Sequence, residues 1–576
     1  MKVRMERRIN WVCALLVAAA CGCSDRGGEK ASAGPVDAGP SQIAEKEPND
    51  RPEQAVAIAG NAIVAASLSA DPSRPDEDWY VVSSPTPRQV DVALSGIAGA
   101  DAAIAVFDQD RNPVLTVNSE GEGKGERFPN LGLSQKLFLR VTGGKKGSGG
   151  AYTLTVLFSD PITGFEREPN DRAADAHPLQ LGQPGQGFLA HSTDQDWYRV
   201  EIPPPSPTPA QVPEGTSPDA VAVQPEPPST ALRIDVTALQ GVRLEVAVLS
   251  AAEAPLFEVR GKDNEALTLR NVGVRADDRT VFVVVKSAWT GTGKDARRGF
   301  SAEQPYSLSV SVEPAGANAE LEPNDDLARA TPLTANGFRE GFISPKTDLD
   351  YFVLRTPQPV LARFQLSGVD RVDLALELVR PKEGGGVETV LRANDGELKE
   401  PEQLNNVACS GECFVKVEGA LKKVDGKWVR DYENAEQAYR LHVTVLPDSG
   451  AEEREPNASV DTATAIALGQ PIRGTIQPKK DVDYYRLDLS NRPARTPIQA
   501  TLLGILKVDV GLYLHHVEDG GALALVQTSD RAKGDQPEIL RYSAEPGIYV
   551  LEVRDSTKRN EANFQDRYQL TVQEGE

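Results

Sequence analysis

The sequence predicts an all-β protein made of four tandem antiparallel β-sandwich domains. One observation is a set of short segments in which apolar and polar residues alternate, separated by Gly, Asn, Asp and Pro. A second is an acidic element, Glu-x-Glu-Pro-Asn, that occurs four times and is followed each time by an Asp-x-Asp-aromatic-aromatic segment. The acidic element begins at Glu45, Glu166, Glu320 and Glu453, and the following segment begins at Asp76, Asp194, Asp348 and Asp481. Such recurrence over long spacings indicates repeated whole domains.

Each copy ends on a similar predicted strand of the form Tyr-x-Leu-x-Val. These strands start at Tyr152, Tyr306, Tyr439 and Tyr568. The repeats therefore predict domains at residues 45–160, 161–316, 317–449 and 450–576.

Period-two alternation predicts the strands inside each domain, with one face of each strand buried. The first domain shows it at 90–94, 102–107, 137–141 and 152–156, the second at 232–236 and 281–285, the third at 364–366, 372–376 and 414–417, and the fourth at 508–514 and 548–553. No long helical period is present, although residues 53–58 could form one short turn. The class is therefore all-β.

The second domain carries a proline-rich insertion at 203–228. Proline cannot occupy a sheet interior, so we expect an extended excursion from a hairpin. It is either a ligand for a partner or a tolerated surface loop.

The N-terminus predicts an exported protein. Residues 1–20 combine positive charge with a short apolar run that ends in small residues before Cys21. The segment resembles the signal of bacterial lipoproteins, which implies a lipid anchor on Cys21, with Cys23 as the alternative acceptor. An ordinary secretory signal cut near Ala20 is the other reading. Residues 21–44 predict a flexible tether, and the anchor places the protein in the cell envelope, at the outer membrane.

The mature part contains two cysteines, Cys409 and Cys413. An oxidising compartment favours a disulfide between them. A metal pair is the alternative, but no His or Cys nearby completes a zinc site.

The net charge is −22 and the pI about 4.9. A nucleic-acid partner requires the opposite sign, so we exclude that class. Excess acid suits divalent-cation binding.

The acidic element has the residue types of a calcium site. In an extended segment, Glu45, Glu47 and Asn49 project from one face, and Asp76 and Asp78 can reach the same point. Converging carboxylates repel one another unless a cation lies between them, and Ca²⁺ prefers six to eight hard oxygen ligands. The alternative is that these acids only cap turns and face water, while Trp79, Trp197, Tyr351 and Tyr484 are core aromatics.

Taken together, the acidic element, the Asp-x-Asp-aromatic strand and the Tyr-x-Leu-x-Val strand resemble the bacterial pre-peptidase C-terminal domain. This family is similar to the collagen-binding domains of bacterial collagenases, which implies jelly-roll-like sandwiches that bind structural Ca²⁺. The matching ligands in the first domain are Glu45, Glu47, Asn49, Asp50, Asp76 and Asp78. In the second they are Glu166, Glu168, Asn170, Asp171, Asp194 and Asp196. In the third they are Glu320, Glu322, Asn324, Asp325, Asp348 and Asp350.

The fourth domain departs from this pattern. It keeps Glu453, Glu455, Asn457, Asp481 and Asp483, but Ala458 stands where Asp is expected. We therefore expect a weak metal site there.

No known catalytic motif is present in the sequence, and no histidine recurs at matching positions in the four domains. We therefore expect no enzymatic activity. The predicted function is that of an adhesion or binding module toward an extracellular or envelope protein or polysaccharide, with membrane contact through the lipid anchor only. The alternative is a passive structural spacer in an envelope assembly.

Overall fold

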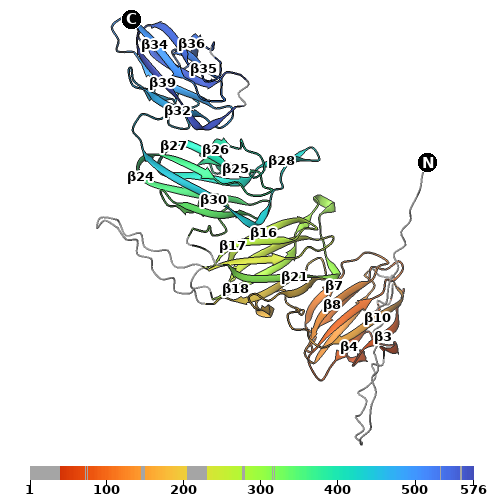
Figure 1. Ribbon diagram of the computed structural model, residues 1–576. Coiled ribbons are helices and arrows are strands. Elements are labelled where there is room, and N and C mark those ends of the chain that lie inside the picture. The colour runs from red at the N-terminus through yellow and green to blue at the C-terminus, as the bar shows by residue number, and fades with distance from the viewer. Residues whose placement is uncertain are drawn as a thin grey trace, which may run out of the picture.

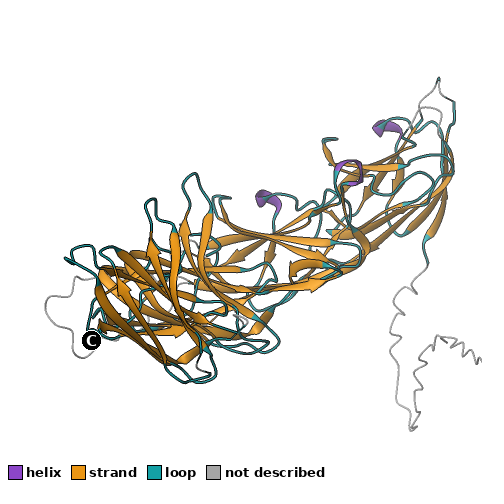
Figure 2. Cartoon of the chain, turned by 90° about the horizontal axis from the view of Figure 1, so that it is seen from above, coloured by secondary structure: helices purple, strands orange, loops and turns teal. Residues whose placement is uncertain are grey.

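The computed structural model describes residues 39–575, apart from 72, 74, 75, 145–148, 204–229, 275–278, 314, 315, 317, 532 and 558–560. The described residues form 39 β-strands and no α-helix, which confirms the all-β class. Three single 3-10 turns lie at Pro52–Gln54, Ala173–Asp175 and Gly293–Asp295 (Figure 2). The described part holds no helix with the length and apolarity needed to cross a membrane. The signal, Cys21, Cys23 and residues 204–228 of the insertion lie outside the described residues.

Four hydrophobic clusters divide the strands into four consecutive units. We call β1–β10 unit 1, β11–β21 unit 2, β22–β30 unit 3 and β31–β39 unit 4. Figure 1 shows the units in chain order, each next to the following one.

Unit 1 consists of two five-stranded sheets that share one core. One sheet has the order β1 (Ser41–Ala44), β3 (Ala62–Leu68), β10 (Gly150–Ser159), β5 (Arg88–Leu94), β8 (Glu126–Leu133). The other has the order β2 (Val56–Ile58), β4 (Glu77–Ser83), β9 (Lys136–Thr142), β6 (Ala103–Phe107), β7 (Pro113–Val117). Buried side chains of both sheets, such as Val64 and Tyr80, belong to the same cluster. Pairing is antiparallel except for β1–β3 and β2–β4.

Units 2 and 4 repeat this arrangement. In unit 2 the sheets are β11 (His177–Leu179), β13 (Gln195–Glu201), β18 (Thr280–Ser287), β15 (Arg243–Ser250), β16 (Pro255–Asp263) and β12 (Gly185–Leu189), β21 (Ser301–Glu313), β14 (Thr230–Val236), β17 (Leu267–Val274). A small hairpin joins β19 (Trp289–Thr290) to β20 (Arg297–Arg298). In unit 4 the sheets are β31 (Thr464–Ile466), β33 (Val482–Asp488), β38 (Ile548–Asp555), β35 (Val510–Val517), β36 (Leu523–Ser529) and β32 (Ile472–Ile476), β39 (Asn563–Glu574), β34 (Thr496–Leu503), β37 (Glu538–Ala544).

Unit 3 differs because two of its strands run through both layers. Its single sheet has the order β23 (Phe338–Ile343), β30 (Asn434–Pro447), β24 (Leu349–Leu366), β27 (Glu402–Gly419), β25 (Leu374–Pro381), β26 (Val387–Ala393), with β22 (Thr331–Leu333) beside β24. The long β24 takes the place of the separate strands β4 and β5 of unit 1, and its register shifts between Thr356 and Val360. A hairpin of β28 (Leu421–Val424) and β29 (Lys427–Arg430) follows β27.

The predicted core aromatics need a correction. The fully buried member of each aromatic pair is the second residue, Tyr80, Tyr198, Phe352 or Tyr485. Trp197 and Tyr484 are only half-buried, and Trp79 and Tyr351, although buried, lie outside the core clusters. The reason is the two-residue period of a strand, which places Asp196 and Tyr198 on the inner face and Trp197 on the outer one.

Candidate cation sites

Three carboxylates come together at the start of every unit. They belong to the two glutamates of the acidic element and to the second aspartate of the Asp-x-Asp pair, and within each group one oxygen from each residue lies within 4.8 Å of the others. The groups are Glu45, Glu47, Asp78; Glu166, Glu168, Asp196; Glu320, Glu322, Asp350; and Glu453, Glu455, Asp483. The acidic element and the adjacent strand therefore meet as the sequence spacing suggested.

In units 1, 2 and 3 the asparagine of the element fixes both glutamates, whereas in unit 4 the Asn457 backbone N–H donates to Glu455 and its Nδ2 has no partner among the described residues. In unit 2, Asn170 Nδ2 donates to Glu166 Oε2 at 2.8 Å, and the Asn170 backbone N–H donates to Glu168 Oε2 at 2.7 Å. The N–H of Phe188 on β12 donates to Glu166 Oε1 at 3.1 Å. The Glu-Pro peptide bond after the second glutamate is cis in all four units.

Several buried oxygens of these carboxylates and of the neighbouring asparagines, together with one of Asp194, have no hydrogen-bond partner in the described part of the chain. They are Asn49 Oδ1 and Asp78 Oδ1; Glu168 Oε1, Asn170 Oδ1, Asp194 Oδ1 and Asp196 Oδ1; Glu322 Oε1, Asn324 Oδ1 and Asp350 Oδ1; and Glu455 Oε1, Asn457 Oδ1 and Asp483 Oδ1. A buried acceptor without a partner costs free energy, and most proteins avoid it. Its repetition at matching atoms in four units fits a bound cation.

The raised pKa values of these carboxyl groups also favour a bound cation. Burial raises the pKa of Glu168 well above its usual value, and the nearby Asp194 and Asp196 raise it further. Burial likewise raises the pKa of Asp78 and of Glu453 to about 8, and that of Glu320 to about 7. Ionised, these carboxylates repel one another in a poorly solvated place, so a divalent cation is the natural counter-charge.

The other predicted ligands lie beside the three-carboxylate groups. The first aspartate of each pair caps the loop before its strand: Asp348 Oδ2 accepts from Ser344 N at 2.8 Å, and Asp481 Oδ2 accepts from Gln477 N at 2.8 Å. Asp171 accepts from Gln195 N at 3.2 Å. Ala458 replaces that last position in unit 4, where the three-carboxylate group is nonetheless complete. The weaker fourth site stays a prediction.

The sequence analysis missed the role of the tyrosine on the last strand of each unit. The Tyr439 hydroxyl lies 2.7 Å from Asp350 Oδ2 and 2.9 Å from Glu320 Oε2, and its one proton can be donated to either of them. Tyr152 and Tyr568 donate to Asp78 Oδ2 at 2.5 Å and to Asp483 Oδ2 at 2.6 Å, and Tyr306 donates to Asp196. The recurrent Tyr-x-Leu-x-Val pattern was the available signal, but it was read only as a strand marker.

A glycine opposite this tyrosine gives the site its space. Gly341 on β23 pairs with Tyr439, and a Cβ there would lie 2.2 Å from Glu320 Oε2 and 2.4 Å from the Tyr439 hydroxyl oxygen. A Cβ at Gly474 would lie 2.2 Å from Glu453 Oε2, and one at Gly187 would lie 2.7 Å from the Tyr306 hydroxyl oxygen and 2.8 Å from Glu166 Cγ. Unit 1 has Ala66 at the paired position.

The site of unit 1 is more open than the other three. Glu47 is exposed, whereas Glu168, Glu322 and Glu455 are 1%, 4% and 2% exposed. Within the described residues, unit 1 is also the one unit without a preceding unit.

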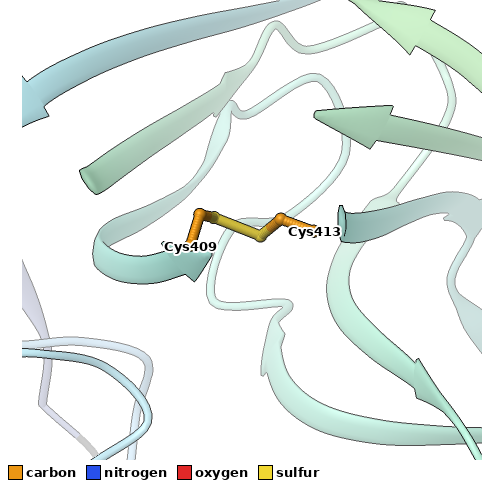
Figure 3. Close-up of a disulfide and its surroundings, with 2 residues drawn as sticks. All are labelled: Cys409 and Cys413. Atoms are coloured by element: carbon orange, nitrogen blue, oxygen red, sulfur yellow. A yellow bond between two sulfur atoms is a disulfide. The ribbon is translucent and has the colours of Figure 1, made fainter. Parts of the chain in front are cut away.

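Figure 3 shows the disulfide between Cys409 and Cys413. Their Cα atoms are 5.5 Å apart, and both cysteines lie on β27. Between them the strand bends at Gly411, which has a φ of 75°. The disulfide therefore spans the point at which β27 passes from one layer to the other.

No protein-family model matches the chain, and no curated protein matches it. Among solved structures, the chain is similar to the pre-peptidase C-terminal domain of a collagenase from Bacillus anthracis, with 21% identity and a TM-score of 0.16, over 19% of this chain and 99% of that domain. It is also similar to PliG of Salmonella Typhimurium, a periplasmic inhibitor of g-type lysozyme, with 15% identity and a TM-score of 0.12, over 20% of this chain and 98% of the inhibitor. Both matches are local and cover about one unit's length.

Proposed function

We propose that this chain is a non-catalytic cell-envelope lipoprotein made of four jelly-roll-like β-sandwich domains, each stabilised by Ca²⁺. Units 1, 2 and 4 each supply two mainly antiparallel sheets that share one hydrophobic core, as a sandwich requires. Unit 3 reaches a comparable core through strands that cross between layers. The acidic elements match the ligand pattern of the pre-peptidase C-terminal family, which the domains resemble.

One observation carries the proposal of Ca²⁺: the buried, unpartnered oxygens at matching atoms of four units. The clustered groups contain only carboxylates, with the amide oxygen of the motif asparagine nearby. Zn²⁺ would favour His or Cys ligands, and Mg²⁺ retains more of its water. A hard cation with many flexible oxygen ligands fits best.

The domains in this proposal bind an extracellular or envelope protein or polysaccharide. Support comes from the β28–β29 hairpin, which projects from unit 3 (Figure 1). Trp428, the second residue of β29, is 66% exposed, and Leu421 and Val424 on the same hairpin are also exposed. Lys423 lies opposite Trp428 across the hairpin. An exposed aromatic side chain beside apolar and basic neighbours is typical of binding sites.

Binding of the purified mature chain to immobilised envelope polysaccharide and to outer-membrane protein, in Ca²⁺, tests this role. We expect Trp428→Ala to weaken binding at least several-fold. Leu525→Ala is the matched control because Leu525 is an exposed apolar residue of unit 4, away from the hairpin. Equal binding by both variants and the native chain would remove the hairpin from the proposal.

A passive spacer is the second candidate. Polar contacts between consecutive units favour it, since they suit an extended array that holds two points apart; Lys346, for example, reaches Glu265 of the preceding unit at 2.9 Å. Stabilisation by Ca²⁺ without binding to either immobilised probe would support the spacer.

A further inference from the structure

The acidic element of each later unit lies against a bulged strand of the unit before it. Strands β8, β17 and β27 have register shifts that leave an extra residue near Asn130, Asn271 and Asn406. The next residues, Leu131, Val272 and Val407, form parallel bridges with Glu168, Glu322 and Glu455. The second glutamate of each site is therefore paired with the preceding unit.

Two backbone hydrogen bonds fix this pairing at every junction. At the third junction, Glu455 N–H donates to Asn406 O at 2.9 Å, and Ala408 N–H donates to Glu455 O at 2.9 Å. The first two junctions have the same bonds, from Glu168 to Asn130 (3.1 Å), Gly132 to Glu168 (2.7 Å), Glu322 to Asn271 (2.9 Å) and Gly273 to Glu322 (2.8 Å). One residue thus supplies its carboxylate to the site and its backbone to the neighbouring unit.

At the first and third junctions, the bulge asparagine also reaches the site with its side chain. Asn406 Nδ2 donates to Glu453 Oε1 at 2.9 Å, and Asn130 Nδ2 donates to Glu166 Oε1. Asn271 occupies the matching bulge of β17, and both Asn271 and Asn406 have left-handed backbones, with φ of 52° and 49°. Asparagine tolerates this conformation better than most residues.

The other flank of the site also contacts the preceding unit. Ser344, whose N–H holds Asp348, donates its hydroxyl to Thr268 O at 2.8 Å. Gln477, whose N–H holds Asp481, donates its amide to the carbonyl of Gln403. Both flanks of these sites therefore depend on where the preceding unit lies.

The two ends of the array provide internal comparisons. The corresponding strand of unit 4, β37, pairs with β34 in continuous register and has Arg541, Tyr542 and Ser543 where the others have Asn, an apolar residue and Gly or Ala. No described unit follows it. At the other end, unit 1 has no described unit before it, and its Glu47 is exposed.

We propose that the sites of units 2, 3 and 4 are two-domain sites, in which cation binding and docking of the preceding unit are coupled. Asn130 and Asn406 act as positioning residues that orient the first glutamate of the site. This inference rests on the cation site proposed above. Without the cation, carboxylates such as Glu453 and Glu455 repel one another, and the linker that contains them can leave the bulged strand. With the cation bound, the linker is ordered, so the preceding unit docks with less loss of entropy. Docking in turn favours cation binding, so the coupling is reciprocal.

Hydrogen exchange of the full mature chain, in Ca²⁺ and in chelator, tests the coupling. We expect Ca²⁺ to slow exchange in the four acidic elements and also in β8, β17 and β27. Strand β37, which no described unit follows, should show no such effect. If the acidic elements are protected but β8, β17 and β27 respond no more than β37, the coupling is wrong while the cation sites stand. If the acidic elements themselves do not respond, both proposals fail.

A pair of adjacent variants tests the positioning role. Asn406→Ala removes the amide that holds Glu453, and Asn405→Ala removes an amide that donates instead to Phe564 O of the same neighbouring unit at 3.2 Å. Replacing a residue that hydrogen-bonds to a metal ligand typically changes the metal affinity about 10- to 100-fold. We expect Asn406→Ala to raise the Ca²⁺ concentration for half-protection of residues 453–458 about 10-fold or more. Asn405→Ala should leave this Ca²⁺ concentration near the native value. In both variants, the Ca²⁺ concentration for half-protection of residues 166–171 should also stay near the native value.

An equal shift in both variants would show general loosening of the junction and would overturn the positioning role. Asn130→Ala provides a second test at another junction. It should move the midpoint of residues 166–171 and leave that of 453–458 in place.

Discussion

Glu453→Gln is expected to have opposite effects on stability with and without Ca²⁺. The Glu453 side chain is fully buried, and burial raises its pKa from 4.5 to about 8. Holding this group in the fold therefore costs roughly 3–5 kcal/mol between pH 7 and 8 when no cation is bound. Thr475 and Asn406 donate hydrogen bonds to Oε1, which offset part of the cost. A neutral glutamine removes the charge, so we expect the chelated protein to gain about 1–3 kcal/mol.

In Ca²⁺ the same substitution removes a ligand. A site filled at 100 times its dissociation constant contributes about 2.7 kcal/mol, and most of this should be lost. Thermal unfolding at pH 8, in millimolar Ca²⁺ and in excess chelator, measures both effects. Glu518→Gln changes the net charge equally on an exposed turn of the same unit and should shift neither melting temperature. A loss of stability of the same size in both conditions would refute the reasoning.

Three further predictions follow from the same geometry. Gly341→Ala would push a Cβ against Glu320 and should destabilise the protein by about 1–3 kcal/mol, whereas Gly60→Ala, with open space around its Cβ, should be near neutral; urea unfolding measures both. Tyr439→Phe deletes a hydroxyl that lies within hydrogen-bonding distance of two buried carboxylates, and in Ca²⁺ it should cost about 2–4 kcal/mol by calorimetry. In chelator, stability should fall as pH rises from 5 to 8, because carboxyls such as Asp78, with a pKa raised to about 8, bind protons more tightly in the folded state than in the unfolded one. Ca²⁺ should reverse this trend, since it requires the ionised form, and unchanged pH profiles would contradict it.

The alternating pattern predicted the all-β class because strand burial repeats every two residues, whatever the packing around it. The contact between the acidic element and Asp78, and its counterparts in the other units, was also predictable, because the acidic element and the Asp-x-Asp segment always recur together. The pattern could not tell which aromatic faces inward, and Tyr80 rather than Trp79 fills the core. The face depends on register, which a pair of adjacent aromatics leaves open.

The contribution of the preceding unit was not predictable in the same way. Asn130-Leu131-Gly132 and Asn271-Val272-Gly273 are short segments at unequal distances from the elements they contact. Their role depends on a bulge, and a bulge is created by the pairing of two strands rather than by the tripeptide itself. The continuity of β24 was not predictable either, because Pro357 and Pro359 between Thr356 and Val360 favour a break, yet the strand continues through them with a register shift.

Thermal unfolding of the mature chain in millimolar Ca²⁺, in millimolar Mg²⁺ and in excess chelator tests the central claim most directly. Four acidic groups that each contain buried, unpartnered oxygens predict a Ca²⁺-specific rise in melting temperature of roughly 5–10 °C, reduced by Asp350→Ala in the third site. A melting temperature that is the same in all three conditions would contradict the cation sites and leave the acidic elements as structural turns.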